Sequence, residues 1–95
     1  MAAPAFYVIA YDIVDDKRRL KIAKCLEAVG ERVQASVFEA YLTAAELEKV
    51  QKKVGKLLKA EEDSLRVYFI CSDCRGKIKT SGRGKVTEPP GVKIV

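Results

Sequence analysis

Histidine is absent from this 95-residue sequence. Without an imidazole, the chain cannot build a histidine acid–base pair, a Ser-His-Asp triad or a histidine-ligated metal site. Any catalysis must therefore use carboxylates, a metal ion, or lysine, tyrosine or cysteine side chains. Long apolar runs are also missing, since none approaches the roughly 20 residues that cross a bilayer. Met1–Ala5 carries no basic residue, so we expect no signal peptide and a soluble, cytoplasmic protein with no membrane partner.

The sequence has only three cysteines, Cys25, Cys71 and Cys74, which is an odd number. This count, without a secretion signal, argues against a disulfide framework. Cys71 and Cys74 form a C-x-x-C motif, which supplies two of the four ligands of a structural zinc site, so a second copy would have to supply the rest. A redox pair would open a helix after a strand, and we expect no helix after Cys74. The pattern favours the third alternative, cysteines at a strand end without a chemical role.

Acidic residues are outnumbered, because 18 Lys and Arg against 13 Asp and Glu give a net charge of +5. A basic surface indicates a polyanionic partner, usually nucleic acid, although a lysine-rich soluble protein has the same balance. The 48% of hydrophobic residues suffice for one core. We therefore expect a single domain over residues 1–95, with residues 1–4 as an N-terminal extension. So small a domain buries a modest fraction of its surface, which an oligomer would increase.

The segment Ala5–Asp12 is an almost unbroken apolar run that ends at a carboxylate. Its β-branched and aromatic residues predict a central strand covered on both faces. Asp12 is then expected where the strand meets solvent, and Asp15 and Asp16 follow within a turn. Carboxylates and the cations of the next segment therefore gather at one strand end.

Two helices are predicted from apolar spacing and capping residues. The first can be capped by Asp15 or Asp16, is expected to stop at Gly30, and buries one apolar face. That face consists of Ile22, Leu26 and Val29. The second opens at the capping box Thr43–Glu46. Its apolar face consists of Leu47, Val50, Val54 and Leu57.

The remaining segments complete a sheet. Arg32–Leu42 alternates in two phases, which predicts two short strands with a break near Val37–Phe38. Ser64–Cys71 is a further strand, and residues 75–95 form a basic C-terminal segment. Its end, Val92–Val95, is a short tail strand that either lies on an exposed sheet edge or frays.

This order of elements predicts an α+β, ferredoxin-like βαββαβ fold, an antiparallel sheet with two helices on one face. The opposite face of the sheet would be left partly bare. Strand alternation gives it the apolar residues Phe6, Val8, Tyr68 and Ile70. A bare apolar face predicts a homodimer.

Three motifs in this order resemble a known family. They are Tyr11-Asp12-Ile13 at the end of the first strand, Arg18–Lys24 at the start of the helix, and Arg32–Glu39 leading to Leu42. Together they resemble the small CRISPR-associated protein of the spacer-acquisition complex, the non-integrase subunit of the CRISPR-associated endoribonuclease family. The resemblance covers about residues 5–95.

The resemblance implies a ferredoxin-like homodimer that two integrase dimers flank, sharing a DNA duplex. It also implies a metal-dependent endonuclease acting on single-stranded RNA or double-stranded DNA. Asp12 matches the metal ligand of the family, and the other positions implicated in activity are matched by Tyr11, Arg19, Arg32 and Phe38. Two positions depart from the family pattern. Lys21 stands where some members have arginine, so the positive charge is kept but the bidentate hydrogen bonding of a guanidinium is lost. Ala35 stands where an aromatic residue is common.

Phosphodiester hydrolysis without histidine asks for a metal ion, expected here to be Mg²⁺ or another divalent cation. A single Asp12 carboxylate is too few ligands for a metal site, but two copies of Asp12 that meet across the two-fold axis of a dimer would make an adequate Mg²⁺ site. Asp15 and Asp16 are either outer groups of that site or helix caps. Arg19 and Arg32 either neutralise charge on the phosphate or form a solvated basic face.

Three hypotheses follow: a metal-dependent nuclease centred on Asp12, a DNA-binding scaffold for the integrase, and, more weakly, a general RNA-binding module that stacks bases on Tyr7 and Tyr68. The scaffold needs only cations that contact the phosphate backbone. The candidate nucleic-acid ligands are Lys17, Arg18, Arg19, Lys21, Lys24, Lys77, Lys79, Arg83 and Lys85.

Overall fold

The strand predicted first in the sequence, β1 (Ala5–Asp12), lies inside a four-stranded sheet. The computed structural model describes residues 3–89. The other strands are β2 (Glu31–Gln34), β3 (Val37–Leu42) and β4 (Ser64–Ile70), and the helices are α1 (Asp16–Glu27), α2 (Ala44–Leu57) and α3 (Ser72–Arg75). All strand pairs are antiparallel, in the order β2-β3-β1-β4.

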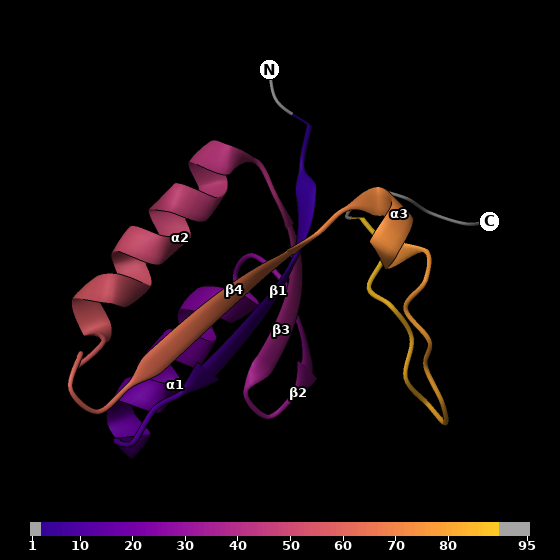
Figure 1. Ribbon diagram of the computed structural model, residues 1–95. Helices are drawn as coiled ribbons and strands as arrows, with labels where there is room; N and C mark the ends of the chain where they lie inside the picture. Colours follow the sequence, from indigo (N-terminus) through magenta and orange to yellow (C-terminus); the bar gives the residue numbers. More distant parts are fainter. Residues whose placement is uncertain (1–2, 90–95) are drawn as a thin grey trace.

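Helices α1 and α2 cover one face of the sheet, whereas α3 and the segment after it lie on the other side (Figure 1). We call these the helix face and the open face. The architecture confirms the predicted α+β, ferredoxin-like arrangement with two helices on one face. In the described part of the chain, no helix is long and apolar enough to cross a membrane.

Both long helices begin at the predicted caps. The Asp15 side chain accepts a hydrogen bond from the backbone N–H of Arg18, so Asp15 rather than Asp16 caps α1. Thr43 and Glu46 form the predicted capping box of α2. These bonds satisfy N–H groups that have no partner within a helix.

Helix α1 ends at Glu27, before the predicted stop at Gly30. Gly30 is required for another reason. A Cβ atom built there would lie 2.6 Å from the carbonyl oxygen of Glu39, so the chain passes β3 too closely for any side chain. The prediction of the helix end was wrong because it treated a glycine needed for packing as a cap.

The segment 32–42 does form two short strands, but the break was predicted too far along the chain. The turn is Ala35–Ser36, and the pairing shifts register between Arg32 and Gln34. The backbone N–H of Tyr11 donates to the carbonyl of Ser36, which ties the turn to β1. All four residues of β2 are exposed, so the alternation of apolar and polar residues in this strand does not correspond to a buried and an exposed face.

The core lies between the sheet and the two long helices. Its most buried large side chains are Ile9, Ile22, Leu26, Phe38 and Val54. The predicted apolar faces of both helices are confirmed, since Val50 is also buried and Leu47 and Leu57 pack against the core. Burying these side chains is the main stabilising contribution, at about 1.5–3 kcal/mol each.

The open face carries the predicted apolar residues, because Phe6 pairs with Ile70 and Val8 with Tyr68 across β1 and β4. This face is not bare along its whole length, however. Phe6 is only 3% exposed, because the Tyr41 ring lies 5.0 Å away and the Arg75 guanidinium lies 5.9 Å above its ring. Tyr68 remains 45% exposed.

The basic segment after α3 returns to the open face at Thr87. Its backbone N–H and hydroxyl both donate to the Glu39 carboxylate, at 2.9 and 2.6 Å, and the Tyr41 hydroxyl donates to its carbonyl. The described part of the segment is therefore held on β3. The predicted tail strand Val92–Val95 lies outside the described residues.

Candidate functional site

Asp12 is the last residue of β1, and its side chain is exposed. It pairs with Ser64 across β1 and β4, on the same face as Val8 and Ala10. Within residues 3–89, no three or more His, Cys, Asp or Glu side chains are placed to hold a metal ion. Among the described residues of one chain, Asp12 is therefore not part of a group of three or more candidate metal ligands.

The two neighbouring acids are engaged in the start of α1. Asp15 is the N-cap, and the N–H of Arg18 lowers the pKa of its carboxyl by binding the charged form. Asp16 forms an ion pair with Arg19, with 2.7 Å between Oδ1 of Asp16 and Nη1 of Arg19. These contacts favour the helix-cap interpretation over an outer role around a metal ion.

Arg19 orders the loop that follows Asp12. Its guanidinium donates to the carbonyl oxygen of Ile13 through Nε and Nη2, at 3.2 and 3.0 Å, and Nη2 also reaches the carbonyl of Val14 at 3.3 Å. A planar guanidinium suits this role because its donors lie in a rigid fork. Arg19 thus fixes the strand-to-helix connection beside Asp12.

Three other candidates come together on the helix face. Tyr11 is only 5% exposed, and its hydroxyl donates to the carbonyl of Ala35 at 3.0 Å. Its ring stacks 6.1 Å from the fully buried ring of Phe38. Arg32 covers this pair, with its guanidinium 5.3 Å from the Phe38 ring and 3.5 Å from the Tyr11 hydroxyl.

This cluster is separated from Asp12 by the sheet itself, because successive side chains of a strand point to opposite faces. Within one chain, Tyr11, Arg32 and Phe38 thus do not share a centre with Asp12. Their contacts anchor the β2–β3 turn and fill the core.

The sequence did not predict the ion pair between Arg18 and Asp63, which lies next to the loop that follows Asp12. Asp63, interpreted as part of a polar loop, has a fully buried side chain that pairs with Arg18 at 2.8 Å. Arg18 also pairs with Glu62 at 3.0 Å. The Arg18 guanidinium holds the pKa of Asp63 well below its usual range, and Asp63 raises the pKa of Arg18 in return. The one feature of the sequence that could have indicated this buried acid is the position of Asp63 directly before the strand β4.

The candidate cations fall into two groups. On α1, Lys17, Lys21 and Lys24 are exposed and make no ion pair within residues 3–89, whereas Arg18 and Arg19 are engaged as above. Beyond α3, Lys77 pairs with Asp73 at 3.2 Å. The other cations there, Lys79, Arg83 and Lys85, are exposed.

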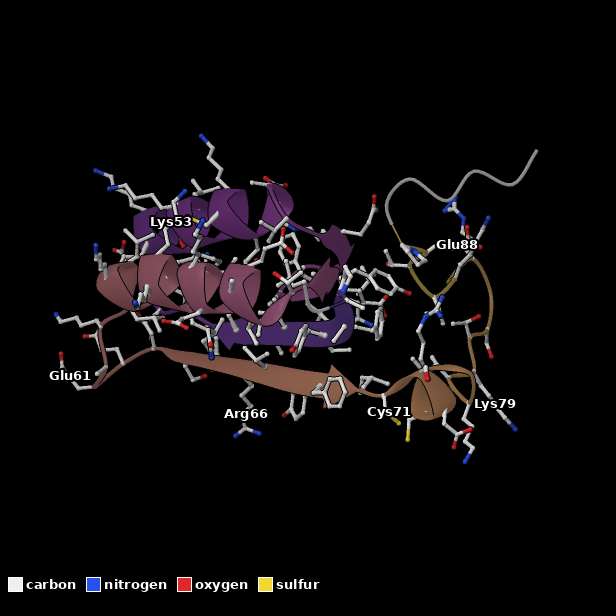
Figure 2. All side chains as sticks on the ribbon, turned by 90° about the horizontal axis from the view of Figure 1, so that it is seen from above. Lys53, Glu61, Arg66, Cys71, Lys79 and Glu88 are labelled. Carbon is white, nitrogen blue, oxygen red and sulfur yellow. The ribbon has the colours of Figure 1, made fainter. Side chains whose placement is uncertain are left out.

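The two groups lie on different sides of the molecule. Helix α1, which carries the first group, lies on the helix face (Figure 1), whereas Lys79 of the second group projects from the segment beyond α3 (Figure 2). The free lysines of α1 face away from the sheet, because the buried side of that helix is the one with Ile22 and Leu26. They are therefore on the opposite side of the sheet from Asp12.

Comparison with known proteins gives consistent matches. Residues 5–78 match the family model described as CRISPR associated protein Cas2. The chain is 46% identical over 89 residues to "CRISPR-associated endoribonuclease Cas2 3" of Synechocystis sp., covering 94% of this chain and 97% of that protein. It is 48% identical over 84 residues to "CRISPR-associated endoribonuclease Cas2 1" of Chloroflexus aurantiacus, covering 87% and 90%.

Solved structures agree with the fold. A Thermus thermophilus structure described as the hypothetical protein TT1823 superposes with a TM-score of 0.79 at 41% identity, covering 90% of this chain and 99% of that one. A chain of a "Partial Cas6-RT-Cas1--Cas2 complex" superposes with a TM-score of 0.71 at 31% identity, covering 80% and 89%.

Proposed function

Because the chain belongs to the CRISPR associated protein Cas2 family, we propose that it acts in CRISPR spacer acquisition as a dimeric scaffold that holds duplex DNA for an integrase. The partner is supported by the similar chain in a complex that contains Cas1 and Cas2. The observation that carries the scaffold is the set of free lysines on α1, namely Lys17, Lys21 and Lys24.

Lysines of this kind suit phosphate contacts. They are exposed, they repeat at four and three residues along a 12-residue helix, and they make no ion pair among residues 3–89. Backbone contacts carry no sequence information, so the dimer would recognise the shape and length of a duplex. The exposed cations Lys79, Arg83 and Lys85 would add a second region of contact.

The homodimer is proposed from the open face. Val8 and the 45% exposed Tyr68 lie on the same face as Asp12, and the segment that reaches Thr87 contacts this face at Glu39, which pairs with Val8 on the β3 side. An isologous interface places each residue near its own copy. Two open faces meeting in this way would bury Tyr68 and bring two Asp12 carboxylates together.

The scaffold is tested by salt-dependent binding to duplex DNA. Changing Lys17, Lys21 and Lys24 together to Ala should weaken binding and reduce the slope of log K against log salt by about 0.9 per lost phosphate contact. Lys52→Ala is the control, because Lys52 already pairs with Glu48 at 3.2 Å. An unchanged slope in the triple variant would contradict the proposal.

A second function is a divalent-metal-dependent endonuclease, which the names of the relatives and the exposed Asp12 favour. Asp12 from each of two copies would hold the ion, since residues 3–89 of one chain bring no three candidate ligands together. When bound, such an ion polarises a phosphoryl oxygen of the substrate. This chain's own residues would position the site, with Arg19 holding the loop after Asp12.

The nuclease is tested with labelled single-stranded RNA and duplex DNA, each with Mg²⁺ and with EDTA. Asp12→Ala should abolish cleavage and leave duplex binding unchanged, because Asp12 is on the opposite side of the sheet from the α1 lysines. Glu61→Ala, which removes another exposed carboxylate, is the control and should cleave normally. Cleavage that survives Asp12→Ala would exclude a site centred on this residue.

The general RNA-binding module finds less support. Its two candidate stacking residues, Tyr7 and Tyr68, lie on opposite faces of the sheet, because Tyr7 pairs with Phe69 and Tyr68 pairs with Val8. They therefore do not form one stacking surface.

A further inference from the structure

The C-x-x-C motif occupies a turn that the sequence did not predict. Cys71 follows β4 and is the N-cap of the short helix α3, and Cys74 lies inside that helix. Strand, first cysteine and helix therefore follow one another, which is the arrangement expected of a redox pair. Helix α3 ends at Arg75, so the segment that follows the motif is not helical, as expected, but the helical turn Ser72–Arg75 itself was not predicted, because four residues are too few to show apolar periodicity.

The two thiols are close and accessible. The Cys71 sulfur accepts a hydrogen bond from the backbone N–H of Cys74, at 3.4 Å between the two atoms. Both cysteines are exposed and free, and Figure 2 shows Cys71 where β4 meets α3. Because the Cys71 sulfur already lies 3.4 Å from the backbone nitrogen of Cys74, a small side-chain movement brings the two sulfurs to bonding distance.

The two sulfurs differ in chemical character. The N–H and the thiol of Cys74 both stabilise a thiolate on Cys71, so the pKa of Cys71 is lowered from its ordinary value. The pKa of Cys74 is raised, because its thiol donates to Cys71. Since the thiolate is the attacking species, Cys71 is suited to react first and Cys74 second.

We propose that Cys71 and Cys74 are a reactive dithiol that exchanges with small disulfides such as oxidised glutathione and closes reversibly into an intramolecular disulfide. The Cys71 thiolate attacks one sulfur of the small disulfide, forming a mixed disulfide and releasing one small thiolate. Cys74, after losing its proton to solvent, attacks the Cys71 sulfur and releases the second small thiolate. The protein loses two electrons, the small disulfide gains them, and the two protons end on the two small thiols.

The position of the pair gives this reaction a structural consequence. Arg75 directly follows Cys74, and its guanidinium lies 5.3 Å from the Tyr41 ring, whose hydroxyl holds the carbonyl of Thr87. The dithiol is thus at the base of the basic segment that crosses the open face. Its closure fixes the turn from which that segment leaves the sheet, independently of whether the protein cleaves or only binds nucleic acid.

The experiment uses the full chain, reduced and then equilibrated in mixtures of reduced and oxidised glutathione. Remaining thiols are alkylated and the products are measured by intact mass and peptide mapping. The wild type should lose two alkylatable thiols together, and the map should show a 71–74 cross-link. Persistent single glutathione adducts in the wild type, or a pair that stays reduced in fully oxidised glutathione, would overturn the proposal.

Single variants assign the order of attack. Cys74→Ser should trap one glutathione on Cys71, and Cys71→Ser should form its adduct about tenfold more slowly. Equal rates in these two variants would overturn the assigned order. Cys25→Ser is the matched control, because Cys25 is half-buried and packs against the core, so this variant should behave like the wild type. Loss of the two-thiol reaction in Cys25→Ser would show that another pair forms.

Discussion

Arg18 donates two hydrogen bonds to the buried carboxylate of Asp63, at 2.8 and 3.2 Å, across 45 positions of the chain. The same carboxylate accepts backbone N–H groups from Val14 and Lys59, both at 3.0 Å. It therefore joins the loop after Asp12 to the loop before β4. An ionised acceptor suits this role, because charge-assisted hydrogen bonds are stronger than neutral ones.

Replacing Asp63 should destabilise the fold. Asp63→Asn removes the charge and half of the acceptor capacity while keeping the shape, and leaves Arg18 without its buried partner. We expect the melting temperature to fall by about 10 °C. Glu62→Gln is the control, since Glu62 is the more exposed partner of Arg18 and should shift the melting temperature far less. Similar shifts in the two variants would contradict the central role of Asp63.

Asp63 should also make stability depend on acid. Its pKa in the fold lies well below the value of about 3.9 expected in the unfolded chain. Below about pH 4 the unfolded chain binds the extra proton, so this contribution is complete above that pH and is lost as the pH falls towards the folded-state pKa. Urea unfolding at pH 6 and pH 3 should show a smaller loss for Asp63→Asn than for the wild type. Equal losses would exclude Asp63 as the source.

Substitutions of Phe38 and Tyr11 should lower the stability of the fold, because both side chains belong to the core. Phe38 is fully buried, so Phe38→Ala should lower the free energy of unfolding by about 3–5 kcal/mol. Tyr11→Phe loses the hydrogen bond to Ala35, worth about 1 kcal/mol, and the longer 3.5 Å contact that Arg32 makes with the hydroxyl. Val33→Ala, at a 41% exposed position of β2, should change it by no more than about 0.5 kcal/mol. Denaturant titration measures all three, and a Phe38→Ala protein as stable as the wild type would refute this ranking.

Two glycines should respond in opposite directions to the same change. Gly55 is inside α2, and a Cβ atom there meets nothing within 4 Å, so Gly55→Ala should stabilise the fold by about 1 kcal/mol. Gly30→Ala should destabilise it, because its Cβ would clash with the carbonyl of Glu39. Denaturant unfolding of the two variants checks this. A stabilised Gly30→Ala would show that the chain is not so close to β3 there.

Glu39 should hold the basic segment on the open face. Glu39→Ala removes the acceptor of both Thr87 hydrogen bonds, so the Thr87 amide should exchange its hydrogen at least about tenfold faster. Glu31→Ala is the matched control, because Glu31 pairs directly with Glu39 on the neighbouring strand and is exposed. Hydrogen exchange followed by mass spectrometry distinguishes them. Unchanged exchange in Glu39→Ala would mean that other contacts hold the segment.

Part of the candidate site could be predicted from alternation alone. Tyr11 and Asp12 are neighbours in a strand, so they had to point to opposite faces. Alternation does not say which face the helices cover, and so it did not show that Tyr11 would be buried beside Phe38 and Arg32 while Asp12 stayed exposed. The family motif places these residues in one group, and the fold divides them between two sides of the sheet.

The sequence by itself determined the elements and their order, because caps, apolar spacing and strand alternation act over a few residues. Asp15, the Thr43–Glu46 capping box and the alternation of apolar positions within β1 and within β4 are of this kind. Only the tertiary structure decided that Asp63 is buried under Arg18, that Gly30 lies against Glu39, and that Thr87 closes over the sheet. These contacts join residues from different elements, so they form only when the fold brings both partners together, and no local pattern of residues encodes them.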